Sequence, residues 1–206
     1  MIWTWFVTTD GDRLQQALAR FDAANAEDPN TETVAGRRRP KELVYAERMT
    51  RWLGRLEPRA SEALQLAARA QHLRRWVILR DDYPAGREGY HRWRTTLYRF
   101  HAVEAAKVLR EVGYDDETIG RVGSLLQKKR MKQDPDCQTL EDVVCLVFLE
   151  SYFSDFAKEH DKERLVAILR KTWRKMSPRG HEAALGLDLP AGARALVERA
   201  LGTGDV

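Results

Sequence analysis

Residues that support small cross-linked or turn-rich folds are scarce in this sequence. The two cysteines, Cys137 and Cys145, form no CxxC pair and no zinc-ligand spacing, which excludes a zinc ribbon. Glycine (13) and proline (7) are too few for a sandwich or propeller built on many tight turns. No apolar stretch approaches the roughly 20 residues of a membrane span. We therefore expect a soluble protein of the reducing cytoplasm with no membrane partner.

An excess of charge of one sign is also missing. Lys and Arg number 35 and Asp and Glu 31, so the net charge of +4 suits an anionic ligand but not an obligate DNA-binding protein. The GxGxxG, P-loop, GxSxG and HExxH motifs are absent, which excludes the enzyme classes that these motifs mark. What the chain has is 43% hydrophobic and 32% charged residues, a composition that supports a folded core.

Helical periodicity dominates the sequence, and no segment shows the alternation of a strand. Gly113 suits a helix end, Ser177 before a proline suits a helix start, and Thr139 opens a T-x-x-D pattern close to a capping box. The sequence predicts an all-α protein, a single compact bundle of about eight to nine helices over residues 11–206, after an N-terminal extension of residues 1–10. The predicted helices cover residues 10–26, 41–56, 61–79, 87–112, 115–130, 139–156, 161–176, a short segment from 178, and 191–201.

Two histidines are candidates for chemistry. His101 lies on the apolar face of its predicted helix, with Arg94 nearly in line one heptad earlier, and a buried histidine needs a hydrogen-bond partner or a metal. A core histidine satisfied by a carbonyl or carboxylate is the alternative. His72, beside Gln71, lies at the edge of another apolar face, close to Arg75. The arginines there could hold an anion through bidentate forks or form an exposed basic face.

Two carboxylates fall on the predicted central helix. Glu150 follows the apolar run 143–149, so its partly desolvated charge must find a cation, either an arginine or a metal. Asp142 is displaced by only about 80° around the helix. It either joins the same site or is the acid of the first helical turn.

Two basic segments could bind phosphate. One precedes and enters the short helix that begins after Ser177, where free backbone N–H groups favour an anion. Solvated cations that balance the helix dipole are the alternative for both segments. The residues of these segments are Lys171, Arg174, Lys175, Arg179 and His181 in the first, and Lys128, Lys129 and Arg130 in the second.

A resemblance to a known family rests on seven segments. They are Arg20–Pro29, Gln71-His72 with Arg75-Trp76, Gly89-Tyr90 with Trp93-Arg94, Phe100–Ala102, Lys128–Arg130, Leu140–Asp142, and Trp173–His181. In combination they resemble the family catalogued as domain of unknown function DUF4202, found in bacteria, fungi and plants, from about residue 12 to the last predicted helix. Some members carry the label glutamyl-tRNA synthetase, which this sequence does not support because it has no nucleotide-binding signature.

The helix order is more distantly similar to HD-type metal-dependent phosphohydrolases. That resemblance implies an HD-like orthogonal helix bundle and one divalent metal ion, held here by His72, His101 and Asp142. The sequence departs from the pattern where the His-Asp pair is expected, since Gln71-His72 or His72-Leu73 stands there. It also has an apolar residue near Phe148, where an aspartate is usual.

These observations give one favoured hypothesis and one alternative. The first is a His-containing basic pocket for an anionic phosphorylated small molecule or nucleotide, with His72, His101 and Glu150 as catalytic residues if the protein is a phosphohydrolase. Its anion-binding residues are Gln71, Arg75 and Arg94 together with the two basic segments. The alternative is a non-catalytic helical module that binds RNA or another phosphate-rich partner. Its basic segments and the aromatic rings of Trp76, Trp93 and Trp173 would contact that partner.

Overall fold

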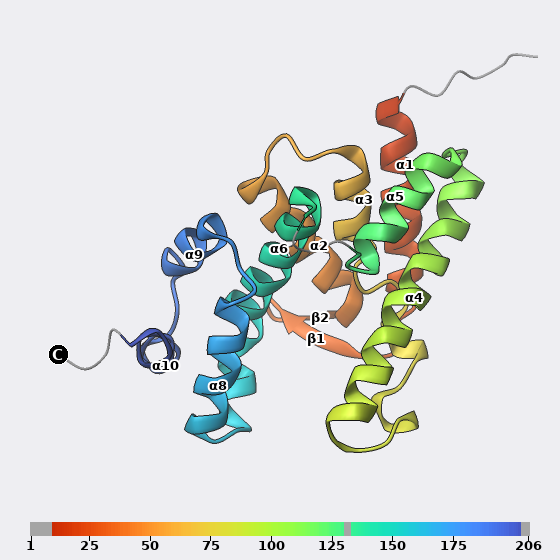
Figure 1. Ribbon diagram of the computed structural model, residues 1–206. Helices are drawn as coiled ribbons and strands as arrows, with labels where there is room; N and C mark the ends of the chain where they lie inside the picture. The colour runs from red at the N-terminus through yellow and green to blue at the C-terminus, as the bar shows by residue number, and fades with distance from the viewer. Residues whose placement is uncertain (1–9, 130–132, 203–206) are drawn as a thin grey trace, which may run out of the picture. The chain divides into compact units, whose positions relative to one another are not determined.

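The computed structural model describes residues 10–129 and 133–202. These residues form ten α-helices, two short 3₁₀ helices and one β-hairpin, which confirms the all-α class (Figure 1). Within the described residues the chain divides into two compact units, one made of residues 10–50 and 60–129 and the other of residues 51–59 and 133–202. The predicted extension, residues 1–10, lies almost wholly outside the described residues.

In its described part, the first unit contains seven elements of regular structure besides two 3₁₀ turns. Its core consists of large apolar side chains that are fully buried, among them Phe21, Met49, Leu64, Leu97 and Leu125. Burying such side chains supplies most of the stabilisation of a helical unit. Its elements are α1 (Asp10–Ala26), β1 (Thr31–Val34), β2 (Arg37–Pro40), the first part of α2 (Lys41–Leu56), α3 (Glu62–Arg69), η1 (Arg75–Val77), η2 (Arg80–Asp82), α4 (Gly86–Val112) and α5 (Asp116–Leu126).

The prediction that the chain contains no strand was wrong. β1 and β2 pair antiparallel, with Thr31 opposite Pro40 and Val34 opposite Arg37. Ala35 and Gly36 form the turn with φ of 49° and 77°, the left-handed geometry of a two-residue hairpin loop. Neither strand alternates apolar and polar residues, because neither has a fully buried face. The usual sequence signal of a strand is therefore missing here.

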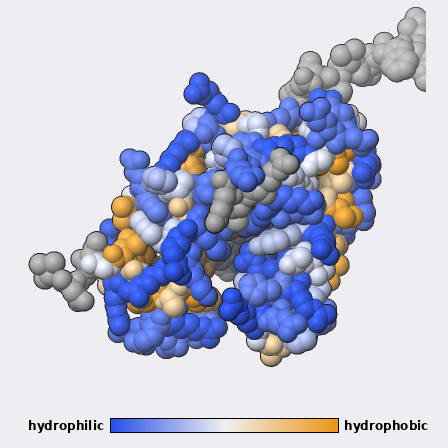
Figure 2. All heavy atoms as spheres, in the orientation of Figure 1, coloured by the Kyte–Doolittle hydropathy of each residue, from blue (hydrophilic) through white to orange (hydrophobic). Residues whose placement is uncertain are grey.

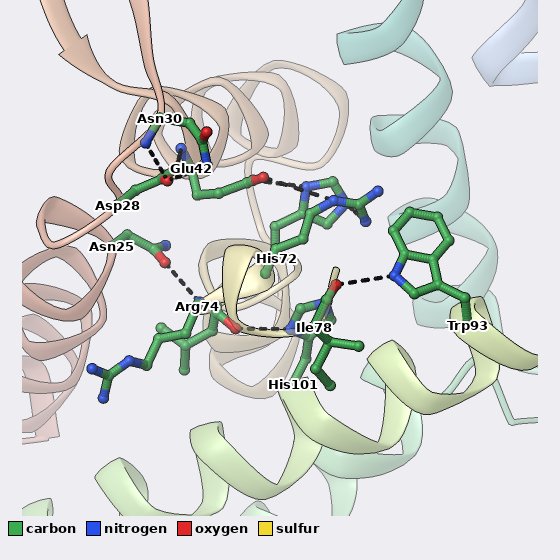
Figure 3. Close-up of polar contacts among 11 residues, drawn as sticks. Asn25, Asp28, Asn30, Glu42, His72, Arg74, Ile78, Trp93 and His101 are labelled. Atoms are coloured by element: carbon green, nitrogen blue, oxygen red, sulfur yellow. Dashed lines mark hydrogen bonds and ion pairs between the residues drawn. The ribbon is translucent and has the colours of Figure 1, made fainter. Parts of the chain in front are cut away.

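The helix predicted over residues 61–79 was too long. α3 ends at Arg69, and a tight turn carries the chain to Arg74, which has a left-handed φ of 53°. The backbone N–H of Arg74 donates to the Asn25 side-chain oxygen at 3.0 Å (Figure 3). A contact from α1 thus stabilises a backbone conformation that no local pattern of residues 70–79 predicts.

The second unit is wholly helical in its described part. Its core includes Leu140, Leu146, Val147, Phe153 and Leu169. Both cysteines lie in α6, buried and without a disulfide bond. The unit consists of the end of α2, α6 (Pro135–Ser151), α7 (Phe153–Lys158), α8 (Lys162–Trp173), α9 (Pro178–Leu185) and α10 (Ala191–Leu201).

The predicted helix over residues 139–156 also had wrong boundaries. α6 begins four residues earlier, where Asp134 accepts hydrogen bonds from the N–H groups of Asp136 and Cys137 and a proline occupies the first turn. It ends at Ser151, and α7 follows as a separate helix, so ten α-helices form rather than eight or nine. Asp142 consequently lies inside α6 and not in its first turn.

The surface of the described chain is mostly polar. Figure 2 shows hydrophilic residues over most of the visible face, with hydrophobic residues in small patches. In the part of the chain that the structure describes, every helix is too short or too polar to cross a membrane.

Candidate functional site

The structure brings the two predicted histidines of the first unit together. His72 lies in the turn after α3, and His101 lies in the middle of α4, where its side chain is buried. Their ring centroids are 6.0 Å apart, with the planes inclined by 32°. Figure 3 shows both rings in one cluster of polar side chains.

A buried carboxylate orients His72. Glu42, in the first turn of α2, places Oε2 3.0 Å from His72 Nδ1 (Figure 3). Asp28 accepts a hydrogen bond from the Glu42 backbone N–H at 3.0 Å and so fixes the start of α2. The Tyr45 ring, one turn further along α2, stacks on His72 at 3.8 Å. The imidazole therefore has one nitrogen on Glu42 and the other, Nε2, directed away from it.

His101 is held by the backbone and keeps one nitrogen without a partner. Its Nδ1 lies 2.8 Å from the Leu73 carbonyl oxygen, so Nδ1 carries the proton and donates. Nε2 is then an acceptor, buried and without a hydrogen bond to any described residue. Burial above all, with the neighbouring His72 next, lowers the pKa of His101 to about 3. The carbonyl-bonded core histidine expected as the alternative is what the structure shows.

Positive charge surrounds this pair. Burial lowers the pKa of His72 well below its ordinary value, and Arg75, Arg94, Lys128 and Lys41 lower it further, in that order. Burial raises the pKa of Glu42, with Arg75 and Lys41 acting against it. His72 is therefore neutral at pH 7 and sits in a positive field.

Arg75 contacts His72 and Glu42 and also the ring of Trp93. Its guanidinium lies 4.7 Å from the centroid of the Trp93 ring, a cation–π contact. Its Nη1 is 3.5 Å from His72 Nε2, and its Nε is 3.7 Å from Glu42 Oε1. The indole N–H of Trp93 donates to the Ile78 carbonyl at 3.0 Å, which fixes the ring under the guanidinium (Figure 3).

An open cleft of about 580 Å³ adjoins the cluster. Four cationic side chains and a single carboxylate, Glu42, line it, so an anionic ligand is favoured there. The sequence reasoning found only Arg75 among these charged residues. For Arg38 the available signal was the cationic run Arg37–Arg39, and no pattern marked Lys41, Glu42 or Arg80. The lining residues are Pro29, Asn30, Thr31, Arg38, Lys41, Glu42, Arg75, Trp76, Ile78, Leu79, Arg80 and Trp93.

The other predicted anion-binding residues of the first unit do not line this cleft. Gln71 is buried, with its Oε1 lacking a partner among described residues. Arg94 donates to the hydroxyls of Tyr90, at 3.2 Å, and Tyr98. The Lys128 ammonium lies over the Tyr98 ring at 5.5 Å. Of the remaining two, Lys129 is exposed and Arg130 lies outside the described residues.

Asp142 and Glu150 belong to the second unit, and each has a full set of partners there. Asp142 Oδ1 accepts from the Ser177 backbone N–H at 2.8 Å, and Oδ2 accepts from the Ser177 hydroxyl at 2.5 Å. A side chain at Gly180 would come within 2.7 Å of Asp142 Oδ1, so this approach requires glycine. Glu150 Oε2 accepts from Arg51 Nη2 and the Trp52 indole N–H, both at 2.8 Å. Glu150 therefore finds the arginine partner that was one of its two expected outcomes.

The basic segment around α9 is largely neutralised inside the second unit. Arg179 pairs with Glu57 at 2.9 Å, and Lys175 lies 3.4 Å from the buried Glu141. His181 stacks on Trp173 at 3.9 Å, and its Nε2 lies 2.8 Å from the Trp173 carbonyl oxygen. Lys171 and Arg174 are exposed.

Side-chain oxygens of the protein already accept or balance the backbone N–H groups at the start of α9. The Ser177 hydroxyl accepts from the Gly180 N–H at 3.1 Å, and the buried Asp142 carboxylate lies beside it. That carboxylate supplies the negative charge that the helix N-terminus favours. The geometry therefore disfavours a phosphate at this helix start.

The predicted metal ligands fit a divalent cation poorly. Among the residues that the structure describes, no three His, Cys, Asp or Glu side chains form a metal-binding group. His101 Nε2 is an acceptor left vacant by the described residues, but the other imidazole acceptor, His72 Nε2, faces the cationic Arg75 guanidinium at 3.5 Å. Both oxygens of Asp142 are occupied by Ser177.

The fold and the cleft define an all-helical protein whose first unit has a cleft lined by cationic side chains, with the His72–His101 pair beside it. The chain belongs to the family described as "Domain of unknown function (DUF4202)", which matches residues 15–197. No curated protein matches it. No solved structure matches it either, so the similarity to HD-type phosphohydrolases stays a prediction.

Proposed function

We propose that the protein binds a phosphorylated small molecule in the cleft of its first unit. The observation that carries the proposal is the charge of the lining, in which Lys41 and Arg75 lie with Glu42, the carboxylate that contacts His72. Arg38 and Arg80 add two guanidinium groups to the same wall. Guanidinium and ammonium groups on a concave surface are the usual means of holding phosphate.

Lys41 and Arg75 are the cations best able to meet the ligand. Arg80 already donates to the carbonyls of Tyr83 and Pro84, and Arg38 donates to the Thr31 hydroxyl. Lys41 is exposed at the start of α2, and its ammonium has no ion pair with any described residue. Lys41 is therefore free to meet a phosphate, whereas Arg75 has only long contacts, 3.5 Å to His72 and 3.7 Å to Glu42, that a phosphate would replace.

Isothermal titration calorimetry with pyrophosphate and with ribose 5-phosphate tests this proposal. We expect binding that Lys41→Ala weakens by about tenfold to a hundredfold, because loss of a charge-assisted hydrogen bond costs roughly 1.5–3 kcal/mol. Lys162→Ala is the matched control, since Lys162 is likewise exposed at the first position of a helix, α8. Binding that is absent, or equally weakened by both substitutions, would contradict the proposal.

Catalysis stays a separate prediction. His72 Nδ1 faces Glu42, which leaves Nε2 as the nitrogen able to accept a proton, while burial and Arg75 lower the pKa of His72 and weaken it as a general base. Hydrolysis of a phosphomonoester by the purified protein, with and without divalent cations, is the corresponding assay. Phosphorylated metabolites are abundant in the cytoplasm, where we place the protein.

A further inference from the structure

The cleft wall carries one acceptor that a phosphate group alone does not use. Glu42 is buried and lines the cleft. Its Oε2 is taken by His72, whereas the Arg75 nitrogen nearest to Oε1 is 3.7 Å away, too long for a hydrogen bond. A carboxylate repels a phosphate, so its place in a cationic cleft calls for a hydrogen-bond donor elsewhere on the ligand.

The same cleft offers an aromatic surface. Trp76, in η1, is half-buried and lines the cleft beside Ile78 and Leu79. Its indole makes no hydrogen bond or ring contact with any residue that the structure describes. Trp93 differs, because Arg75 covers its face and Ile78 accepts its N–H. An uncovered indole beside cations is the arrangement on which a nucleobase stacks.

We infer that the phosphorylated ligand is a ribonucleoside 5′-monophosphate whose base stacks on Trp76 and whose ribose hydroxyl donates to Glu42 Oε1, with the phosphate at Lys41 and Arg75. This inference rests on the proposed function and adds the ligand class. The volume of about 580 Å³ falls in the range of about 300–1,000 Å³ that holds small ligands. The base then meets the uncovered Trp76 ring, the ribose meets Glu42 Oε1, and the phosphate meets Lys41, unpaired among the described residues, and the loosely held Arg75.

Calorimetric titrations compare the common ribonucleoside 5′-monophosphates with ribose 5-phosphate. At least one nucleotide should bind about tenfold tighter than ribose 5-phosphate, because stacking of a base on an aromatic side chain contributes roughly 1–3 kcal/mol. Its 2′,3′-dideoxy analogue should bind about tenfold more weakly, because Glu42 Oε1 then has no donor. Equal affinities for nucleotide and ribose 5-phosphate would overturn the inference and leave the proposed function standing, whereas absence of binding by every probe would overturn both.

Variants of Trp76 separate stacking from folding. Trp76→Ala should weaken nucleotide binding about tenfold and leave ribose 5-phosphate binding unchanged. Trp76→Phe keeps an aromatic face, so it should recover most of the lost affinity. A uniform loss for both ligands, or no recovery with phenylalanine, would show that the indole supports the fold and does not stack on the base.

Discussion

At the scale of single residues, the clearest consequence of the structure is a pH-dependent stability that originates at His101. The buried ring keeps its pKa near 3, whereas an unfolded chain gives histidine a pKa of about 6.5. Between these values the unfolded chain binds a proton that the folded protein does not. Stability is therefore lost as the pH falls below about 6.5, and the neighbouring His72, whose pKa is also lowered, acts in the same direction.

We predict that His101 alone removes about 2 kcal/mol from the free energy of unfolding between pH 7 and pH 5. Urea denaturation at the two pH values measures this loss in the wild type and in His101→Gln, in which the part due to His101 should vanish. His91→Gln is the control, since His91 is exposed on the same helix. A pH dependence that is identical in the wild type and in His101→Gln would show that the ring does not titrate as argued.

The site residues after α3 and on α4 could be predicted from the sequence, whereas those at the start of α2 could not. His72, His101 and Arg75 were predicted because helical periodicity places each at or beside an apolar face. Glu42 and Lys41 were missed, because in the sequence they look like ordinary first-turn residues of a helix. They become site residues only when the turn after α3 packs against the start of α2, a long-range contact that periodicity does not encode.

At the scale of the elements, several boundaries set by local chemistry were predicted, although the Asp134 cap of α6 was missed, and the end of α3, which a distant contact sets, was not predicted. Gly113 ends α4 with a left-handed φ of 90°, and Asp161 and Ser177 cap α8 and α9 as expected. α3 instead ends early because Asn25, on α1, accepts the Arg74 N–H. A cap lies within a few residues of its helix, whereas this partner lies 49 positions away.

Substitutions at the two ends of this contact should change the free energy of unfolding differently. Asn25→Ala should lower the free energy of unfolding by roughly 1–3 kcal/mol, because it removes the buried side-chain oxygen that accepts from the Arg74 N–H. Arg74→Gly should cost little or raise stability by up to about 1 kcal/mol, since glycine adopts the left-handed φ without strain. Chemical denaturation monitored by circular dichroism compares the two variants, and a loss for Arg74→Gly as large as that for Asn25→Ala would contradict this account of the turn.

At the scale of the whole molecule, charge separates the two hypotheses for the ligand. The net charge is only +4, and many arginines are committed to carboxylates within their own unit, as Arg69 is to Asp22 and Arg179 to Glu57. An RNA-binding surface needs a continuous row of unpaired cations along the backbone of the nucleic acid. The cationic groups of the cleft, by contrast, are enough for one phosphate.

We therefore predict that single-stranded RNA binds no tighter than its mononucleotide at about 0.15 M salt. Fluorescence anisotropy of a labelled oligouridine, titrated at about 0.05 M and 0.2 M salt, measures this. Any RNA affinity seen at low salt should fall steeply, because it arises from released counterions and not from a built site. Lys41→Ala should then reduce mononucleotide binding much more than the residual RNA binding. Tight RNA binding that persists at the higher salt and is insensitive to Lys41→Ala would favour the helical RNA-binding module, because the cleft would not be the surface that holds the phosphates.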